Sequence, residues 1–345
     1  MTQSFFRRVM QGTYSGMQRY PRHLWASVRE AAHGDEEAHR LIRPEWARNG
    51  TSRTTREHSP EPKIDLSATW IGHATVLLRL GSVNILTDPV FSKRIGMSVA
   101  AKTFGLARLA PPACKLDDLP PIDIVLLSHA HFDHLDKPTL KHIASDRTVV
   151  VTAERTRRLI PSGFAEVIEL PWGETFEHLG IRILALEAAH WGARTALDQN
   201  RGYSSYLLDS PAGRVFFAGD TAYTRMFDQL GGPDMSMNDD PGRRRGVDLA
   251  VFGIGAYEPW INAHASPEQV WDMFTRMSAS SLLPMHHSTF ELGREPLDEP
   301  MKRLRLAARD DWGRVIGREF GETWRPRVAA SSVEEGPAAR TPQPR

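Results

Sequence analysis

Six consecutive residues carry four side chains of the kinds that bind metal ions. Their order is His-Ala-His-Phe-Asp-His, from His129 to His134. Imidazole nitrogens suit zinc and iron, and a carboxylate oxygen completes a charge-balanced site. A continuous apolar run at 122–127 directly precedes them and is typical of a buried strand. Because α/β folds place ligand sites at strand ends, we interpret the cluster as a metal site rather than a solvated histidine-rich loop.

Further metal-binding side chains each follow another strand-like run. They are His190, Asp220 and the neighbouring pair His286 and His287. Any one of them alone would be read as a cap or turn residue. A metal ion needs about four ligands, so four strands that each end in a His or Asp supply enough donors for two metals. Two metals would share a carboxylate and would activate a water as hydroxide near neutral pH.

The composition limits the possible partners and ligands. The formal net charge is +1 over 345 residues, which gives no reason to expect a nucleic-acid partner. Cys114 is the single cysteine, so an internal disulfide and a cysteine-rich zinc site are both excluded. The sequence has no run of about 18 apolar residues, and no apolar stretch follows Arg7 and Arg8, so we do not expect a secretory signal. We therefore expect a cytoplasmic protein, with contact to a membrane surface left open as a peripheral one.

The elements that position these side chains are predicted from apolar runs and turn signals. Strands dominate the first half of the main body and alternate with helices later, which indicates a layered α/β architecture. The expected strands are 68–71, 74–80, 84–86, 122–127, 148–152, 181–186, 203–209, 214–218, 249–253 and 281–285. The expected helices are 138–144 and 267–277, the second with Ser266 as its N-cap.

Composition also divides the chain into three parts. Residues 1–60 are polar and arginine-rich and are predicted to form a helical extension and linker. Residues 61–325 are predicted to form the main domain, and residues 326–345 a disordered tail. The basic and aromatic residues of the extension suit either an arm packed on the domain or contact with an anionic membrane surface. No assembly signal stands out, so the oligomeric state is left open.

Several segments resemble the metallo-β-lactamase superfamily, and within it the phospholipases D that hydrolyse N-acylphosphatidylethanolamine. The superfamily likeness rests on Ser128–Asp136, His190, Phe217–Thr221 and His286. The likeness to the phospholipase group rests on Thr69–Val76, Leu86–Phe91, Leu119–Asp123, Gly253–Pro259 and His286–Phe290. Ascorbate-6-phosphate lactonase-like proteins are a more distant likeness. The resemblance implies an αβ/βα four-layer sandwich with the metals at one edge, here with an N-terminal helical extension.

The resemblance also implies a ligand set for two zinc ions, although iron or manganese would suit the same donors. One zinc would be held by His129, His131 and His190, and the other by Asp133, His134 and His286. Asp220 would bridge them, so Asp220 and Asp133 are the expected catalytic carboxylates. His286 is preferred over His287 because the family pattern places the ligand four residues before a phenylalanine, here Phe290.

Four more residues match positions near the site in the phospholipase group. His73 and Asp88 are expected either to orient ligand histidines or to be turn and strand-end residues. His264 matches a histidine near the substrate phosphate, and Tyr257 is a candidate substrate contact that could instead pack against a helix. Two features depart from the group: the segment before His264 is shorter, and His287 stands where the group has tryptophan.

The implied function is a dinuclear zinc-dependent hydrolase of lipid metabolism. It would be a phosphodiesterase of phospholipase D type that attacks N-acylphosphatidylethanolamine-like lipids through a metal-activated hydroxide. The alternative is a lactonase or small-molecule phosphodiesterase of the same fold, which the departures from the group favour. An iron-dependent oxidoreductase would use the same ligands, although nothing in the sequence resembles a flavin or thiol partner motif.

Overall fold

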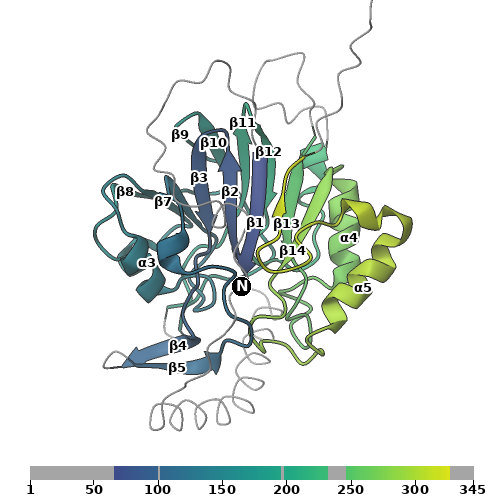
Figure 1. Ribbon diagram of the computed structural model, residues 1–345, viewed down its shortest axis with the longest axis horizontal. Helices are drawn as coiled ribbons and strands as arrows, with labels where there is room; N and C mark the ends of the chain where they lie inside the picture. The colour runs from purple at the N-terminus through teal and green to yellow at the C-terminus, as the bar shows by residue number, and fades with distance from the viewer. Residues whose placement is uncertain (1–65, 100–101, 196–197, 232–245, 327–345) are drawn as a thin grey trace, which may run out of the picture.

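Two β-sheets pack face to face, and helices cover their outer faces (Figure 1). The computed structural model describes residues 66–99, 102–195, 198–231 and 246–326. The extension predicted at 1–60 and nearly all of the tail predicted at 326–345 lie outside the described residues. Within them, the order of helix, sheet, sheet and helix layers is the predicted αβ/βα sandwich.

The first sheet has seven strands in the order β15-β1-β2-β3-β6-β7-β8. They are β1 (Leu66–Gly72), β2 (Thr75–Leu80), β3 (Val83–Thr87), β6 (Ile124–Leu127), β7 (Val149–Thr152), β8 (Glu166–Glu169) and β15 (Thr323–Trp324). Antiparallel pairing joins β15, β1, β2 and β3, whereas parallel pairing joins β3, β6, β7 and β8. Strands β1, β3 and β6 therefore run in one direction and end at the same edge.

The second sheet has six strands in the order β14-β13-β12-β11-β10-β9. They are β9 (Thr175–His178), β10 (Ile181–Leu186), β11 (Ser205–Ser210), β12 (Gly213–Phe217), β13 (Leu249–Gly253) and β14 (Ser281–Met285). The pairs from β9 to β12 are antiparallel, and those from β12 to β14 are parallel. Strands β10, β12, β13 and β14 therefore also share one direction.

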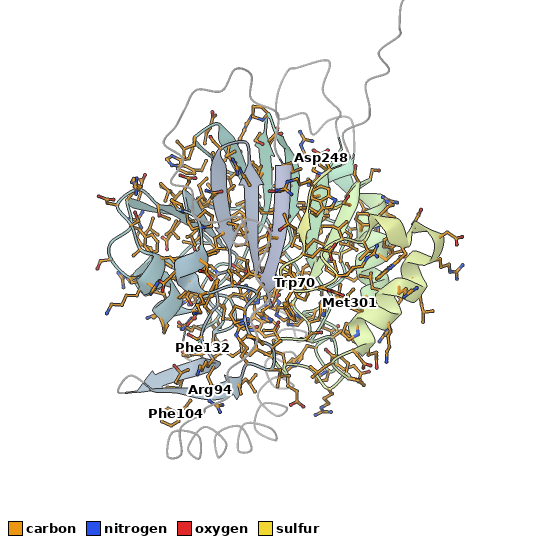
Figure 2. The ribbon with its side chains drawn as sticks, in the orientation of Figure 1. Trp70, Arg94, Phe104, Phe132, Asp248 and Met301 are labelled. Atoms are coloured by element: carbon orange, nitrogen blue, oxygen red, sulfur yellow. The ribbon has the colours of Figure 1, made fainter. Side chains whose placement is uncertain are left out.

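Successive side chains of a central strand point alternately into two different layers of the fold. In β6, Ile124 and Leu126 enter the core between the sheets, whereas Val125 and Leu127 pack toward the helix layer outside the first sheet. Figure 2 labels Trp70, a fully buried residue of the same inter-sheet core. This burial on both faces explains why the strands appear in the sequence as continuous apolar runs.

The helices and the smaller elements complete the layers. Helix α3 (Lys137–Ile143) packs outside the first sheet, and α4 (Pro267–Arg276) and α5 (Glu299–Ala308) pack outside the second. Strands β4 (Arg94–Val99) and β5 (Lys102–Ala107) form a separate hairpin. Short 3-10 turns are η1 (Leu116–Asp118), η2 (Arg157–Leu159), η3 (Asp228–Gly231) and η4 (Arg309–Arg314). None of the helices in the described ranges is long and apolar enough to span a bilayer.

The elements predicted from apolar runs are confirmed, with ends that shift by at most two residues. Ser266 caps α4 as predicted, and its side chain accepts a hydrogen bond from the Gln269 amide. The prediction missed β4, β5, β8, β9, β15 and α5. Strands β8, β9 and β15 are short edge strands, and β8 and β9 are partly exposed with glutamates in them, so they lack the apolar run of a central strand.

Candidate metal centre

The seven predicted metal ligands converge where the strands of like direction end. His129 follows β6, and the loop from 128 to 136 carries His131, Asp133 and His134 before α3 begins. From the second sheet, His190 follows β10, Asp220 follows β12 and His286 follows β14. The centre therefore draws its donors from both sheets.

Three residues in or beside the centre have unusual backbone conformations. His73, Asp88 and His286 have φ angles of 53°, 30° and 60°, which residues other than glycine rarely adopt. Such conformations persist where the surrounding structure enforces them, and they cluster at functional sites. The His286 amide also donates to the His73 carbonyl oxygen at 3.1 Å, which joins the end of β14 to the turn after β1.

One group of donors contains three histidines and an aspartate. The donor atoms of His129, His131, His190 and Asp220 all lie within 4.8 Å of one another. Nδ1 of His131 lies 2.8 Å from Nε2 of His129 and 3.3 Å from Nε2 of His190. Ligand atoms about 2.0 Å from a tetrahedral zinc stand about 3.3 Å apart, so these separations suit three ligands of one ion.

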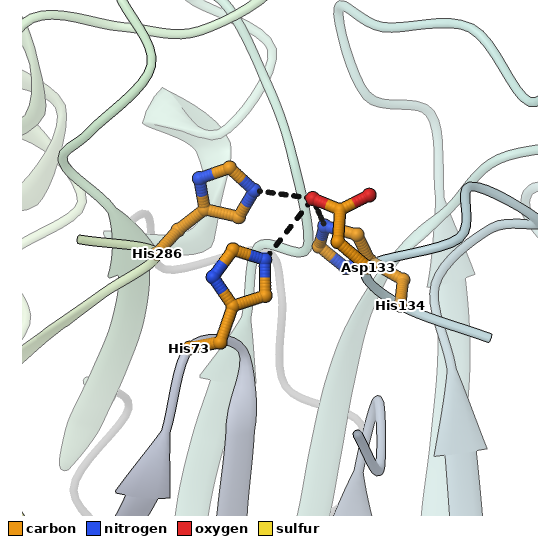
Figure 3. Close-up of side chains that lie close together, drawn as sticks. All are labelled: His73, Asp133, His134 and His286. Atoms are coloured by element: carbon orange, nitrogen blue, oxygen red, sulfur yellow. Dashed lines mark hydrogen bonds and ion pairs between the residues drawn. The ribbon is translucent and has the colours of Figure 1, made fainter. Parts of the chain in front are cut away.

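The second group gathers around the Oδ2 atom of Asp133 (Figure 3). Nε2 atoms of His73, His286 and His134 lie 3.0, 3.2 and 3.5 Å from that oxygen. The three rings come from three different strand ends. His73, which the sequence suggested as an orienting residue, therefore lies close enough to be a donor in this group.

A single oxygen of Asp220 faces both groups. Its Oδ2 atom lies 3.0 Å from Nε2 of His134 and 3.3 Å from Nε2 of His286. The same atom lies 3.7 Å from Nε2 of His190 and 3.8 Å from Nε2 of His129. An oxygen in this position has the geometry to bridge two ions.

The donor set fits divalent metal ions better than it fits a hydrogen-bond network. Nε2 of His134 is buried and makes no hydrogen bond of acceptable angle with any described residue, although Asp220 Oδ2 lies 3.0 Å away. Burial opposes ionisation of Asp133 and Asp220, yet nearby His134 holds both pKa values well below the usual range. Two buried carboxylates kept ionised among imidazoles are the charge arrangement that a cation requires.

Most of the imidazoles are neutral and ready to bind a cation. Burial lowers the pKa of His131 to about 4 and holds those of His129 and His190 well below the usual range. His134 and His286 differ: burial lowers their pKa, but the aspartates outweigh it. The pKa of His134 lies well above its usual range, and that of His286 rises to about 9.

Hydrogen bonds from outside the two groups orient the histidine rings. Asp88 Oδ2 accepts from Nδ1 of His134 at 2.6 Å, and it also accepts from the Ser128 hydroxyl at 2.5 Å. Ser128 Oγ in turn lies 2.9 Å from Nδ1 of His129, which can donate to it. Asp88 and Ser128 thus connect a histidine of one group to a histidine of the other.

The two candidate substrate contacts lie in different surroundings. Nδ1 of His264 lies 3.8 Å from Asp220 Oδ2, and its side chain keeps 13% of its surface exposed beside the two groups. The Tyr257 hydroxyl instead donates to Glu299 of α5 at 2.7 Å, and the Arg303 guanidinium lies over the Tyr257 ring. The structure brings His264 to the centre and turns the Tyr257 hydroxyl to the helix layer.

His287 lies outside both groups. Its ring centroid is 4.7 Å from that of Trp70, and its Nδ1 lies 2.9 Å from the hydroxyl oxygen of the adjacent Ser288. The adjacent His286 points at the aspartates, so the strand end directs the two neighbouring rings to different places.

Two residues of the centre were given no role in the sequence analysis. Ser128 is the first residue of the segment Ser128–Asp136. Its hydrogen bond to Asp88 joins positions 40 residues apart, so no local pattern indicates it. The Trp191 ring stacks on His190, with centroids 4.6 Å apart, and meets His131 edge-on at 5.2 Å. Its position directly after His190 was the one available signal.

Comparison with known proteins identifies the family. The β-lactamase superfamily domain matches residues 83–287, which is more than half of the chain. This chain belongs to the metallo-β-lactamase superfamily. Its fold neighbours include a possible metal-dependent hydrolase of Veillonella parvula, with a TM-score of 0.58, 18% identity, and coverage of 75% of this chain and 99% of that one. The predicted superfamily and its fold are thus confirmed.

Two relatives in the superfamily show the extent of the likeness. N-acyl-phosphatidylethanolamine-hydrolyzing phospholipase D 1 of Caenorhabditis elegans is 32% identical over 284 residues, which cover 75% of each chain. A Mycobacterium tuberculosis protein is 32% identical over 258 residues, which cover 70% of this chain. The match spans 64% of the length of that mycobacterial relative.

Proposed function

We propose that this protein is a dinuclear zinc-dependent phosphodiesterase of phospholipase D type, acting on N-acylphosphatidylethanolamine-like lipids. The observation that carries the proposal is the position of one Asp220 oxygen between two groups of donors. The 32% identity to the C. elegans phospholipase supports the choice of substrate class.

The two groups of donors support the ligand assignment that the resemblance implies. His129, His131 and His190 would hold one ion, Asp133, His134 and His286 the other, and Asp220 both. His73 is neutral, because burial and the charge of His286 lower its pKa to about 3. We therefore assign its Nε2–H as a donor to Asp133 Oδ2, which would orient that carboxylate.

Zinc is favoured by the mixture of imidazole and carboxylate donors, although iron and manganese accept the same set. Elemental analysis of protein purified without added metal distinguishes the three. About two zinc per chain supports the proposal. Iron in place of zinc would favour the oxidoreductase alternative instead.

The residues around the two groups would prepare a phosphodiester for hydrolysis. Two bound divalent ions would lower the pKa of a water and neutralise the charge that develops on the substrate. Asp88 and Ser128 hold the ligand rings in place, so the donors need little rearrangement. Burial lowers the pKa of His264 to about 4, so at neutral pH its imidazole would bind a phosphodiester oxygen by a hydrogen bond rather than by charge.

The direct test incubates the zinc-loaded protein with N-acylphosphatidylethanolamine and measures phosphatidic acid and N-acylethanolamine. Asp220→Ala should lose metal and activity together, because one oxygen serves both groups. His287→Ala is the matched variant, and it should keep its metal because His287 faces Trp70. Absence of phosphatidic acid from fully zinc-loaded wild-type protein would contradict the proposed substrate.

A second candidate is a lactonase or a hydrolase of small soluble phosphodiesters on the same centre. The observation that favours it is the departure from the phospholipase group, in the short segment before His264 and at His287. A panel of lactones and nitrophenyl phosphodiesters separates the candidates. Turnover of these small substrates without turnover of the lipid would select the second candidate.

A lipid substrate makes the location of the protein part of the proposal. We propose that it is cytoplasmic and contacts the membrane peripherally through the extension at 1–60, which precedes the domain at 61–325. Deleting residues 1–60 should then reduce pelleting with anionic liposomes while leaving metal content unchanged. Equal pelleting of both forms would contradict this part of the proposal.

A further inference from the structure

The guanidinium of Arg194 lies against the loop that carries four of the proposed ligands. Its Nη1 atom donates to the carbonyl oxygens of Ala130 and Leu135, each at 2.9 Å, across 64 and 59 residues of sequence. Its Cζ atom lies 4.1 Å from the centre of the Phe132 ring. One side chain therefore contacts the beginning, the middle and the end of the loop from 128 to 136.

Each of the three contacts suits the part of the guanidinium group that makes it. The two N–H bonds of Nη1 serve two carbonyls of fully buried residues, Ala130 and Leu135, which need donors once they leave water. The flat guanidinium face covers the Phe132 ring, a favourable cation–π arrangement. Phe132, which Figure 2 labels, packs against the apolar cluster of Val90, Ile95 and Phe290, so its ring gives the guanidinium a supported surface.

Arg194 belongs to the segment that follows His190, so it connects the two halves of the centre. Its own backbone amide donates to Asp198 Oδ1 at 3.0 Å, and Arg201 holds the other oxygen of Asp198 at 2.6 Å. The base of the side chain is thus anchored on the second-sheet side, while its tip holds the loop of the first sheet.

The side chain stays charged in this position. Burial lowers the pKa of Arg194 to about 10, with Asp136 opposing the shift, so the guanidinium is protonated at neutral pH. It therefore provides charge-assisted hydrogen bonds, which are stronger than those between neutral groups.

We propose that Arg194 is a positioning residue that sets the geometry of the metal-ligand loop. It would act through His131, Asp133 and His134, which stand between the two carbonyls that it holds. It would also act through His129, which directly precedes the first of these carbonyls. This inference rests on the proposed two-metal centre. It concerns metal binding, so its test is separable from the identity of the substrate.

The test compares Co²⁺ binding to metal-free wild-type protein, Arg194→Met and Arg194→Lys. Methionine keeps an unbranched stem but removes both donors, so we expect Co²⁺ affinity to fall about 10–100-fold and the visible absorption bands to change. Lysine keeps two donors without the flat face over Phe132, so it should recover part of the affinity and of the spectrum.

Arg318→Met is the matched control. Arg318 also donates to two backbone carbonyls, of Val315 and Trp312 at 2.9 Å each, and it lies over the Trp312 ring, but its contacts are in the turns after α5. Its loss should leave Co²⁺ affinity and spectrum within about two-fold of wild type.

Wild-type affinity and an unchanged spectrum in Arg194→Met would overturn the proposal, even if its thermal unfolding temperature fell. If Arg194→Met does not fold, Arg194→Lys decides: a changed Co²⁺ spectrum supports the proposal and a wild-type spectrum overturns it. Wild-type protein that binds two metals yet hydrolyses no lipid would contradict the proposed substrate and leave these metal readouts unaffected.

Discussion

At the scale of single residues, hydrogen bonds outside the two donor groups select which imidazole nitrogen faces the metal position. His134, His129 and His190 direct Nδ1 to Asp88, to Ser128 and to the Ala263 carbonyl oxygen, so Nε2 of each ring faces the centre. A neutral imidazole has one donor and one acceptor nitrogen. Placing an acceptor behind each ring therefore directs Nε2 of that ring toward the position of a cation.

Asp88 is the residue on which this orientation depends most. Asp88→Ala removes the acceptor of His134 and the partner of Ser128, so we expect metal affinity to fall about 10–100-fold. Calorimetric titration of the metal-free protein with zinc measures the change. Asp123→Ala is the control. The Asp123 carboxylate accepts a hydrogen bond from the backbone amide of Asn84, and both residues lie outside the centre. Equal losses in the two variants would contradict the role of Asp88.

The raised pKa values of His134 and His286 predict a pH dependence of metal binding. The pKa of His286 rises to about 9, so its ring is protonated at neutral pH in metal-free protein, and the neighbouring aspartates hold the pKa of His134 well above its usual range. A bound cation must displace these protons, so affinity should rise with pH until it passes the pKa of His286. Calorimetric zinc titrations in two buffers of different ionisation enthalpy should give different heats, because the buffer takes up the protons that zinc displaces. Identical heats in the two buffers would contradict the prediction.

At the scale of secondary structure elements, the turns at the strand ends determine where the donors point. Gly219 stands between β12 and Asp220 with a φ of 58°, a conformation that favours glycine. A Cβ atom there would lie 2.6 Å from the Ser128 Cβ, so the turn from the second sheet packs tightly against the ligand loop of the first. The position of Asp220 depends on this close approach.

Gly219→Ala should therefore disturb both stability and metal binding. Alanine in this left-handed conformation costs about 1–2 kcal/mol, and contact with Ser128 adds to that cost. Gly81→Ala separates the two effects, because Gly81 has a φ of 64° but no atom within 4 Å of an added Cβ. We expect both variants to unfold at lower temperature and only Gly219→Ala to lose metal affinity. Retained affinity in Gly219→Ala would show that the turn tolerates displacement.

At the scale of the whole molecule, the proposed metals would connect the two sheets. His129, His131, Asp133 and His134 follow a strand of the first sheet, whereas His190, Asp220 and His286 follow strands of the second. The sheets already share an apolar core, and the Tyr206 hydroxyl of the second donates to the Leu127 carbonyl oxygen of the first at 3.0 Å. Metal binding would add to these contacts only in the folded state.

Removal of metal should thus lower the unfolding temperature of the protein. A ligand that binds only the folded state at 100 times its dissociation constant stabilises it by about 2.7 kcal/mol. Thermal unfolding with and without a chelator measures this difference. Asp220→Ala, which lacks the shared oxygen, should unfold at the same temperature in both conditions. A chelator effect of equal size in that variant would point to metal bound elsewhere.

The amino-acid sequence by itself determined the central strands, helices α3 and α4, and the set of side chains that could hold metal. Buried strands and cap residues have local signatures, so runs such as 181–186 and 249–253 coincide with β10 and β13. Clustering of histidines at 129–134 is equally local, and it indicated the chemistry before any contact was known. The edge strands β8, β9 and β15 and helix α5 lack such signatures, because contacts with distant partners stabilise them.

The tertiary structure alone decided how those side chains face one another. Only the packing of two sheets brings Asp220 between the two donor groups, turns His286 inward and His287 toward Trp70, and commits the Tyr257 hydroxyl to α5. The Arg194 contacts span about 60 residues of sequence, so no spacing rule indicates them. Residue types carry the chemistry of a centre, whereas contacts between distant segments set its geometry.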